Sequence, residues 1–114
     1  MKSLIKYGYA QTGGSSVDKK YKKNTYKISL ENFYRGDKIL KFNKKFIAIK
    51  IDVEGHELKV LKGLEKLIVK NKCIIQIEIF KKNFNSVHKF LKKKKYKIFK
   101  EIKLNSNFFY KNFI

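Results

Sequence analysis

Four titratable residues stand at the end of an apolar stretch of the chain. Residues 46–53 are apolar at nearly every position, which is typical of a strand covered on both faces in a parallel sheet. Asp52, Glu54, His56 and Glu57 lie at its carboxyl end. In an open α/β sheet, ligands bind just outside the carboxyl ends of the strands. These four residues are therefore the first candidates for chemistry.

Asp52 and Glu54 are candidates for acid–base catalysis. Their side chains project to the same side of the chain while it stays extended, because side chains alternate with period two in a strand. Two carboxylates held close together raise the pKa of one of them, which suits a general base. The alternative is that a carboxylate at this junction caps the following helix and complements its dipole. For Asp52 the spacing leaves both interpretations open.

Three neighbouring positions are assigned to substrate binding as a hypothesis: Gly55, His56 and Glu57. Gly55 permits a sharp turn or the close approach of a ligand. His56 is either solvated or part of a ligand pocket, and Glu57 has the alternative role of a charge in the first helical turn. Asp52, Glu54 and His56 are residue types that ligate metals, but their spacing does not require a metal, and none is predicted.

Glu78 is the third candidate catalytic residue, beside Asp52 and Glu54. It lies near the carboxyl end of a second apolar run, residues 73–80. A carboxylate buried there needs a partner or a shifted pKa. Alternatively it points to solvent beside Gln76, which shares its face of the strand. Glu54 and Glu78 on adjacent strand ends form the pair to test first.

The elements that must position these residues follow from the apolar pattern. After Gly55 the period becomes helical as far as Leu67, with leucines and isoleucine on one face and lysines on the other. Gly63 falls inside this helix, where glycine costs about 1 kcal/mol relative to alanine, and so indicates close packing against a neighbour. With the run at residues 73–80, the segment makes a strand–helix–strand unit, for which a right-handed crossover is the default.

The rest of the chain is less strongly patterned. A second helix is expected to start near Asn85 or Ser86, with four apolar residues facing inward: Phe84, Val87, Phe90 and Leu91. Residues 96–104 and 108–110 are expected to pair as a terminal hairpin around a turn at 105–107. In residues 1–45 the pattern predicts strands at 4–9 and 25–29 and a flexible loop at 11–16. It also predicts a solvated charge run at 19–23 and a helical turn at 30–34 that Gly36 ends.

The high positive charge of the chain indicates a second possible class of function, the binding of anionic partners. The formal net charge is +20, from 29 Lys+Arg against 9 Asp+Glu, and such a field attracts phosphate without regard to sequence. Arg35 is the only arginine, however, although proteins that read bases or clamp phosphates rely on the guanidinium group. The richness in Lys, Asn, Ile, Phe and Tyr also fits AT-biased codons. The alternative function is a non-catalytic lysine-rich module that binds nucleic acid or anionic surfaces.

Cysteine usage and hydropathy indicate a cytoplasmic location. Cys73 is the only cysteine, so a disulfide or a zinc site within one chain is not expected. Lys6 interrupts the apolar residues near the amino terminus, which argues against a signal peptide. No stretch is long enough to span a bilayer.

A longer motif connects these residues. The string IKIDVEGHELKVLKG at residues 49–63, followed by CIIQIE at 73–78, resembles the central motif of FkbM-type S-adenosylmethionine-dependent methyltransferases. Residues 13–16 and 28–31 resemble upstream segments of the family. The resemblance implies a partial, Rossmann-like α/β methyltransferase sheet, mostly parallel with an antiparallel terminal hairpin. Its fourth to seventh strands would start at Phe46, Cys73, Tyr96 and Asn107. Residues 1–114 would form one partial domain, with 1–45 as lead-in and 46–114 as core.

The resemblance also implies a reaction. The family implies transfer of a methyl group from S-adenosylmethionine to a hydroxyl of a sugar or small metabolite, with Asp52, Glu54 and Glu78 at the site. The glycine-rich loop and ribose-binding acid of the family's first half have no counterpart, and Gly13-Gly14 lacks the G-x-G-x-x-G spacing. We therefore expect a truncated or split enzyme that does not hold S-adenosylmethionine alone. The strand from Phe46 would present an unpaired edge to a separate N-terminal half or to a homodimer partner.

Overall fold

The computed structural model describes residues 2–6, 9–16, 26–28 and 32–114, which fall into two compact units, Met1–Phe33 and Tyr34–Ile114. The first unit contains a three-stranded antiparallel sheet in the order β2-β1-β3. Its strands are β1 (Lys2–Lys6), β2 (Tyr9–Ser16) and β3 (Tyr26–Ile28). The strand predicted at 25–29 is present over residues 26–28 as β3. The strand predicted at 4–9 is right only for residues 4–6, which belong to β1, because Tyr9 begins β2 and pairs antiparallel with Lys6. The charge run at 19–23 lies outside the described residues.

The loop predicted at residues 11–16 was wrong. These residues belong to β2, which pairs antiparallel with β1 from Lys6↔Tyr9 to Lys2↔Ser16. Gly13 and Gly14 therefore lie inside a strand. The register shifts between Leu4, which pairs with Gln11, and Lys2, which pairs with Ser16, so both glycines fall at an irregularity of the strand, where glycine is common. Glycine-rich composition alone does not distinguish such a strand from a loop.

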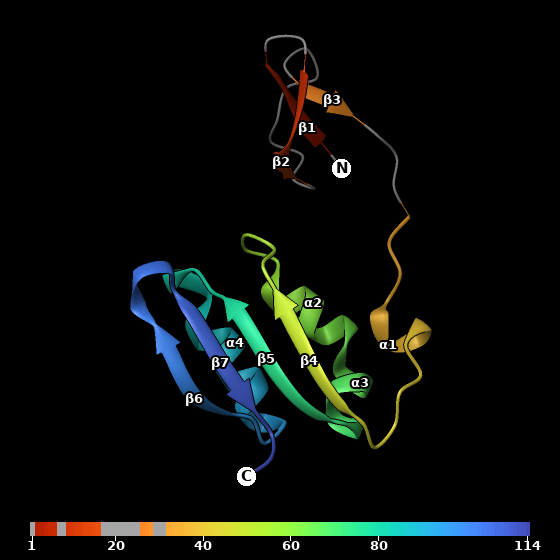
Figure 1. Ribbon diagram of the computed structural model, residues 1–114, viewed down its shortest axis with the longest axis vertical. Coiled ribbons are helices and arrows are strands. Elements are labelled where there is room, and N and C mark those ends of the chain that lie inside the picture. The colour runs from red at the N-terminus through yellow and green to blue at the C-terminus, as the bar shows by residue number, and fades with distance from the viewer. Residues whose placement is uncertain (1, 7–8, 17–25, 29–31) are drawn as a thin grey trace. The chain divides into compact units, whose positions relative to one another are not determined.

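The second unit is built on a four-stranded mixed sheet in the order β4-β5-β7-β6 (Figure 1). The strands are β4 (Phe46–Ile51), β5 (Lys72–Glu78), β6 (Lys97–Ile102) and β7 (Asn107–Lys111). β4 and β5 are parallel, and β7 runs antiparallel to both of its neighbours, β5 and β6. The predicted strand–helix–strand unit and terminal hairpin are confirmed, with the last strand inserted between β5 and β6. The prediction of a mostly parallel sheet was wrong, because only β4–β5 of the three strand pairings is parallel.

Helices α2, α3 and α4 lie on one face of this sheet (Figure 1). The helices are α1 (Gly36–Ile39), α2 (Glu57–Gly63), α3 (Glu65–Lys70) and α4 (Phe84–Lys93), with short 3-10 turns η1 (Lys81–Asn83) and η2 (Lys103–Asn105). The core between helices and sheet buries Leu61, Ile68, Ile75, Ile77, Val87 and Leu91 completely. No helix of residues 34–114 packs on the other side, called here the open face, which carries Lys50, Lys72, Ile74, Lys100, Phe109 and Lys111.

The helix predicted as one continuous segment after Gly55 is two helices. Leu64 separates α2 from α3, with φ −107° and ψ 5°, and its N–H donates to the carbonyls of Val60 at 3.0 Å and Leu61 at 3.1 Å. The apolar stripe continues across the break, because Leu61 and Ile68 are both buried. The periodic apolar pattern therefore predicted the buried face of both helices correctly but did not predict the break at Leu64.

Two glycine expectations fail in this region. A Cβ atom at Gly63 would meet nothing within 4 Å, so the close packing predicted there was wrong. The close approach is at Gly36, where a Cβ would overlap the side chain of Leu64. Gly36 also begins α1 rather than ending a helical turn, and the described part of the turn predicted at 30–34 is not helical.

The last helix begins slightly earlier than predicted. Phe84 is the first residue of α4, whereas the start was predicted at Asn85 or Ser86. Val87 and Leu91 are buried, and Phe84 and Phe90 pack partly buried against the core, so the predicted inward face is confirmed. The helix ends in a Schellman motif, in which the N–H of Tyr96 donates to Leu91 O and that of Lys95, with φ 66°, to Lys92 O, both at 3.0 Å.

Asn71 ties the end of α3 to the segment before β4. It is buried, and its Nδ2 donates to the carbonyls of Phe42 at 2.9 Å and Leu67 at 2.7 Å. Its Oδ1 accepts from the N–H of Lys45 at 2.9 Å. One side chain thus satisfies three backbone groups from segments far apart in the sequence.

Candidate functional site

The parallel pairing of β4 and β5 brings candidate carboxylates to one edge of the sheet. The last paired residues are Ile51 and Ile77, and Asp52 and Glu78 follow directly after them in the two segments. Glu54 follows two residues later. Asp52 and Glu54 are exposed, and Glu78 is half-buried. We call Asp52, Glu54 and Glu78 the carboxyl-end cluster.

A tight turn carries Glu54. The N–H of His56 donates to the carbonyl of Val53 at 3.3 Å, and the two central residues have φ 46° at Glu54 and φ 105° at Gly55, as in a type I′ turn. A residue other than glycine in this left-handed region costs roughly 1 kcal/mol or more of free energy. Asparagine is among the non-glycine residues that adopt this conformation most readily. The prediction that Asp52 and Glu54 share one side required an extended chain, and β4 ends at Ile51, before both residues.

Glu57 holds this turn in place. Its side chain is 1% exposed, and its Oε1 accepts from the N–H of Gly55 at 2.7 Å. Its Oε2 accepts from the side-chain amide of Asn83, the N-cap residue of α4, at 3.4 Å. Glu57 lies in the first turn of α2, as its alternative interpretation predicted. It connects the turn to the start of α4 and so positions the neighbouring Glu54.

Gly55 and His56 lie where the substrate-binding hypothesis requires, between β4 and α2. Gly55 has a positive φ, and a Cβ there would approach Asn83 Nδ2 to 3.9 Å. His56 is the N-cap residue of α2, half-buried, and its side chain does not make the capping hydrogen bond. Binding of substrate by Gly55, His56 and Glu57 stays a prediction.

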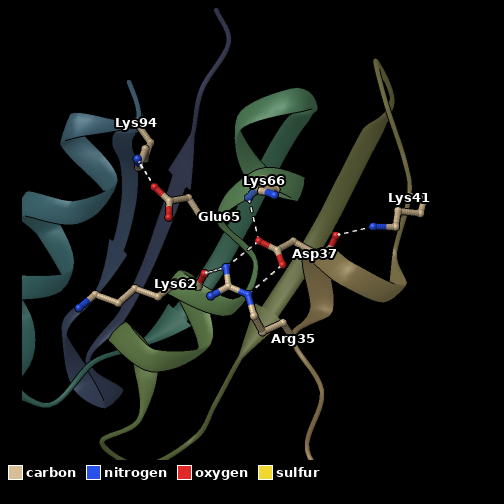
Figure 2. Close-up of polar contacts among 7 residues, drawn as sticks. All are labelled: Arg35, Asp37, Lys41, Lys62, Glu65, Lys66 and Lys94. Atoms are coloured by element: carbon tan, nitrogen blue, oxygen red, sulfur yellow. Dashed lines mark hydrogen bonds and ion pairs between the residues drawn. The ribbon is translucent and has the colours of Figure 1, made fainter.

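A second polar centre, not predicted from the sequence, surrounds Asp37 (Figure 2). Asp37 is 5% exposed, and its carboxylate accepts from Arg35 Nε at 3.2 Å, from Arg35 Nη2 at 3.0 Å and from the N–H of Lys66 at 3.2 Å. Arg35 Nη2 also donates to the carbonyl of Lys62 at 3.0 Å. The only arginine of the chain thus links α1 to the end of α2 and the start of α3. A nearby ion pair joins Glu65 to Lys94.

The spacing Arg35-Gly36-Asp37 is the sequence signal that could have revealed this centre, since residues two apart can form a bidentate pair across a turn. The hydrogen bond from Arg35 lowers the pKa of Asp37 from the ordinary 3.8 to about 2. The partners on α2 and α3 lie far along the chain and carry no local pattern.

We expect Asp37→Asn to weaken the acid sensitivity of the fold. Because the pKa of Asp37 is lower in the folded chain than the ordinary 3.8, its charge stabilises the fold above that value. This stabilisation is lost as the pH falls toward about 2. Urea unfolding across this range should show a smaller loss of stability in Asp37→Asn than in the wild type. Glu101→Gln, at an exposed strand position, is the control, and an unchanged pH profile in Asp37→Asn would contradict the assignment.

The described residues do not fit a nucleotide-like cofactor by themselves. Rossmann-like folds hold such cofactors at a glycine-rich turn between a strand and a helix. Gly13 and Gly14 lie inside β2, so they do not form such a turn. Over residues 32–114, the only glycine between a strand and a helix is Gly55. In the part of the chain that the structure describes, no three His, Cys, Asp or Glu residues cluster closely enough to hold a metal ion.

Comparison with known proteins supplies the family. A family model described as the methyltransferase FkbM domain matches residues 6–98, which include β4, the Glu54 turn, α2, α3, β5 and α4. No curated protein and no solved structure matches the chain. Among the described residues, no helix is both long and apolar enough to cross a membrane.

Proposed function

The chain belongs to the FkbM methyltransferase domain family, and on this basis we propose that it is the acceptor-binding part of an S-adenosylmethionine-dependent O-methyltransferase. The match over residues 6–98 carries the proposal, because it spans the strands and the turn that carry Asp52, Glu54 and Glu78. In this proposal β4 to β7 are the fourth to seventh strands of a Rossmann-like methyltransferase sheet. The acceptor is a small molecule or sugar, and the protein is cytoplasmic.

The carboxyl-end cluster suits an acceptor hydroxyl. A hydroxyl oxygen that gains a methyl group must lose its proton, and a carboxylate within hydrogen-bond reach accepts it as a general base. Glu54 is the best placed, because the Glu57-anchored turn presents its exposed carboxylate beyond the end of β4. In this proposal Asp52 and Glu78, which follow the last paired residues of β4 and β5, accept hydrogen bonds from other hydroxyls of the acceptor.

In this proposal the methyl donor is held by a further segment that adds to the free edge of β4. β4 is an edge strand of its sheet and pairs only with β5 among the described strands. Its other edge presents backbone N–H and C=O groups that a further strand can pair with. We propose that a separate N-terminal half, with a glycine-rich strand–loop–helix, adds to β4. A second copy of the chain is the other candidate for this edge.

Calorimetric titration with S-adenosylmethionine tests whether the methyl-donor site lies outside this chain. The chain alone is expected to show no binding at micromolar concentrations, and micromolar binding would overturn the claim that the donor site lies outside it. The product of an adjacent reading frame that encodes a glycine-rich strand–loop–helix should restore binding when mixed with the chain. If that mixture binds S-adenosylmethionine but transfers no labelled methyl group to any hydroxyl of a sugar and metabolite panel, the proposed reaction is wrong.

A further inference from the structure

Aromatic rings and ammonium groups form a continuous strip along the open face of the four-stranded sheet. Phe46 meets Phe113 edge-on, with ring centroids 5.6 Å apart. The Nζ of Lys111 lies 5.8 Å from the ring centroid of Phe113 and 5.2 Å from that of Phe99. Phe99 in turn contacts Phe109, at 6.2 Å between centroids. We call the four rings, Phe46, Phe99, Phe109 and Phe113, the aromatic strip.

The strip is accessible and positively charged. Phe46 is 74% exposed and Phe99 is 47% exposed, and contiguous exposed apolar patches often mark interaction sites. Further ammonium groups lie over its ends, Lys72 Nζ 5.2 Å from the ring centroid of Phe46 and Lys100 Nζ 5.7 Å from that of Phe109. Every ring of the strip therefore has a lysine ammonium group within 6 Å of its centroid.

A hollow lies beside Phe109. Its volume is about 230 Å³, and it is lined by Ala48, Ile49, Lys50, Ile74, Gln76 and Phe109. Pockets for small molecules usually measure about 300–1,000 Å³, so this hollow, which is open to solvent, is smaller than a usual metabolite pocket. The hollow combines an apolar lining with two polar side chains, Lys50 and Gln76, that are able to hydrogen-bond a heteroaromatic ring.

Charge selects among the possible occupants. A second copy would bring Lys72, Lys100 and Lys111 against their own equivalents in a chain of formal charge +20, which repulsion opposes. An acidic polypeptide would neutralise the lysines but would not use the exposed ring faces. A single-stranded polynucleotide supplies both complements, since its phosphates pair with ammonium groups and its bases stack on aromatic rings.

We propose that the open face binds single-stranded nucleic acid without sequence preference. Bases stack on the aromatic strip and one base occupies the hollow, while phosphates pair with the lysines of the open face. The single arginine is committed to Asp37, and stacking on phenylalanine needs no guanidinium group because every base has a π-face. This activity goes beyond methyl transfer and does not depend on it.

The proposal is tested by fluorescence anisotropy of the full chain with labelled oligouridine and oligothymidine. Each probe has about 12 nucleotides, which is within the usual site sizes of single-strand-binding proteins. The two probes separate RNA from DNA as the source of the strand. Binding of either is expected, and it should weaken steeply as salt rises from about 50 to 200 mM. A duplex of the same length should bind more weakly, because its bases are already stacked. Equal or tighter binding of the duplex would overturn the proposal.

Charge-matched variants localise the binding. The open-face variant carries Lys50→Gln, Lys72→Gln, Lys100→Gln and Lys111→Gln, and the control carries Lys59→Gln, Lys62→Gln, Lys66→Gln and Lys70→Gln, all exposed on helices α2 and α3. The open-face variant should lose at least about tenfold more affinity, and its salt slope should fall by roughly 0.7 for each phosphate contact removed. Equal losses in both variants would show diffuse attraction and would overturn the proposal. Circular dichroism checks that both variants fold.

Ring variants separate nucleic acid from an acidic protein. Phe99→Leu and Phe46→Leu keep an apolar side chain but remove the stacking surface, and each should weaken binding about fivefold or more. Phe42→Leu, 51% exposed but outside the strip, is the control and should change nothing. If Phe99→Leu and Phe46→Leu bind as the wild type does, or if a polyglutamate peptide of equal charge displaces the oligonucleotide equally well, the face binds acidic chains generally and the proposal fails.

Discussion

Glu54→Asn is expected to lower methyl transfer by the reconstituted enzyme at least about hundredfold while leaving the chain as stable as the wild type or more stable. The substitution removes the proposed base and places Asn-Gly at the two positive-φ positions, the sequence that type I′ turns prefer. Loss of activity would then accompany a gain in stability of up to about 1 kcal/mol. Initial rates with labelled donor and urea unfolding measure the two quantities.

Lys95→Asn is the matched control for Glu54→Asn. Lys95 also has a positive φ, 66°, but ends α4 and lies outside the carboxyl-end cluster. It should gain similar stability with unchanged methyl transfer. Should Glu54→Asn retain more than about a tenth of the wild-type rate, Glu54 would not be the base, since a general base contributes at least about hundredfold. Asp52→Asn would then be the next variant to measure.

Asn71→Asp is expected to lower the free energy of unfolding by about 3 kcal/mol or more near pH 7. The substitution keeps the size of the side chain but replaces the Nδ2 donor, which serves Phe42 O and Leu67 O, with a charged oxygen facing those carbonyls. The site is buried, so water cannot relieve the repulsion. Urea unfolding monitored by circular dichroism measures the loss.

Acid should partly reverse the effect of Asn71→Asp. A protonated carboxyl regains one donor, so the deficit relative to the wild type at the same pH should shrink as the pH falls toward about 4, near the ordinary pKa of aspartate. Asn105→Asp, on an exposed 3-10 turn, makes the same chemical change without burial and should cost little at either pH. A similar loss in both variants would show that the hydrogen bonds of Asn71 are not the cause.

The sequence predicted the parts of this fold that depend on local apolar patterns. The apolar runs at β4 and β5 indicated neighbouring parallel strands, which the structure has. The prediction that the first of them is covered on both faces was wrong, because Phe46, Ala48 and Lys50 of β4 are exposed. The proximity of Glu54 and Glu78 at the strand ends stays a prediction. After Gly55 the apolar residues on one helical face, with lysines on the opposite face, correctly predicted which side of α2 and α3 faces the core. The helical spacing of apolar residues continues across the bend between the two helices.

The features that sequence reasoning missed depend on contacts between distant residues. Glu57 is an ordinary first-turn charge until Asn83, 26 residues later, donates to it. Asp37 likewise looks solvated until the N–H of Lys66, 29 residues later, reaches its carboxylate. Gly63 was wrongly predicted to pack closely against a neighbouring element, because glycine inside a helical pattern suggests close packing. The glycine that packs closely is Gly36, against the side chain of Leu64.

The position of β7 governs when this protein can fold during its synthesis. β5 lies between β4 and β7, so one side of β5 stays unpaired until residue 111 has left the ribosome. β4, α2, α3 and β5 are then already outside the exit tunnel with an apolar strand edge exposed, a state prone to association with other nascent chains. The four-stranded sheet therefore closes only after β7 has been made and has paired with β5, and chaperones that shield strand edges should act on the chain until then.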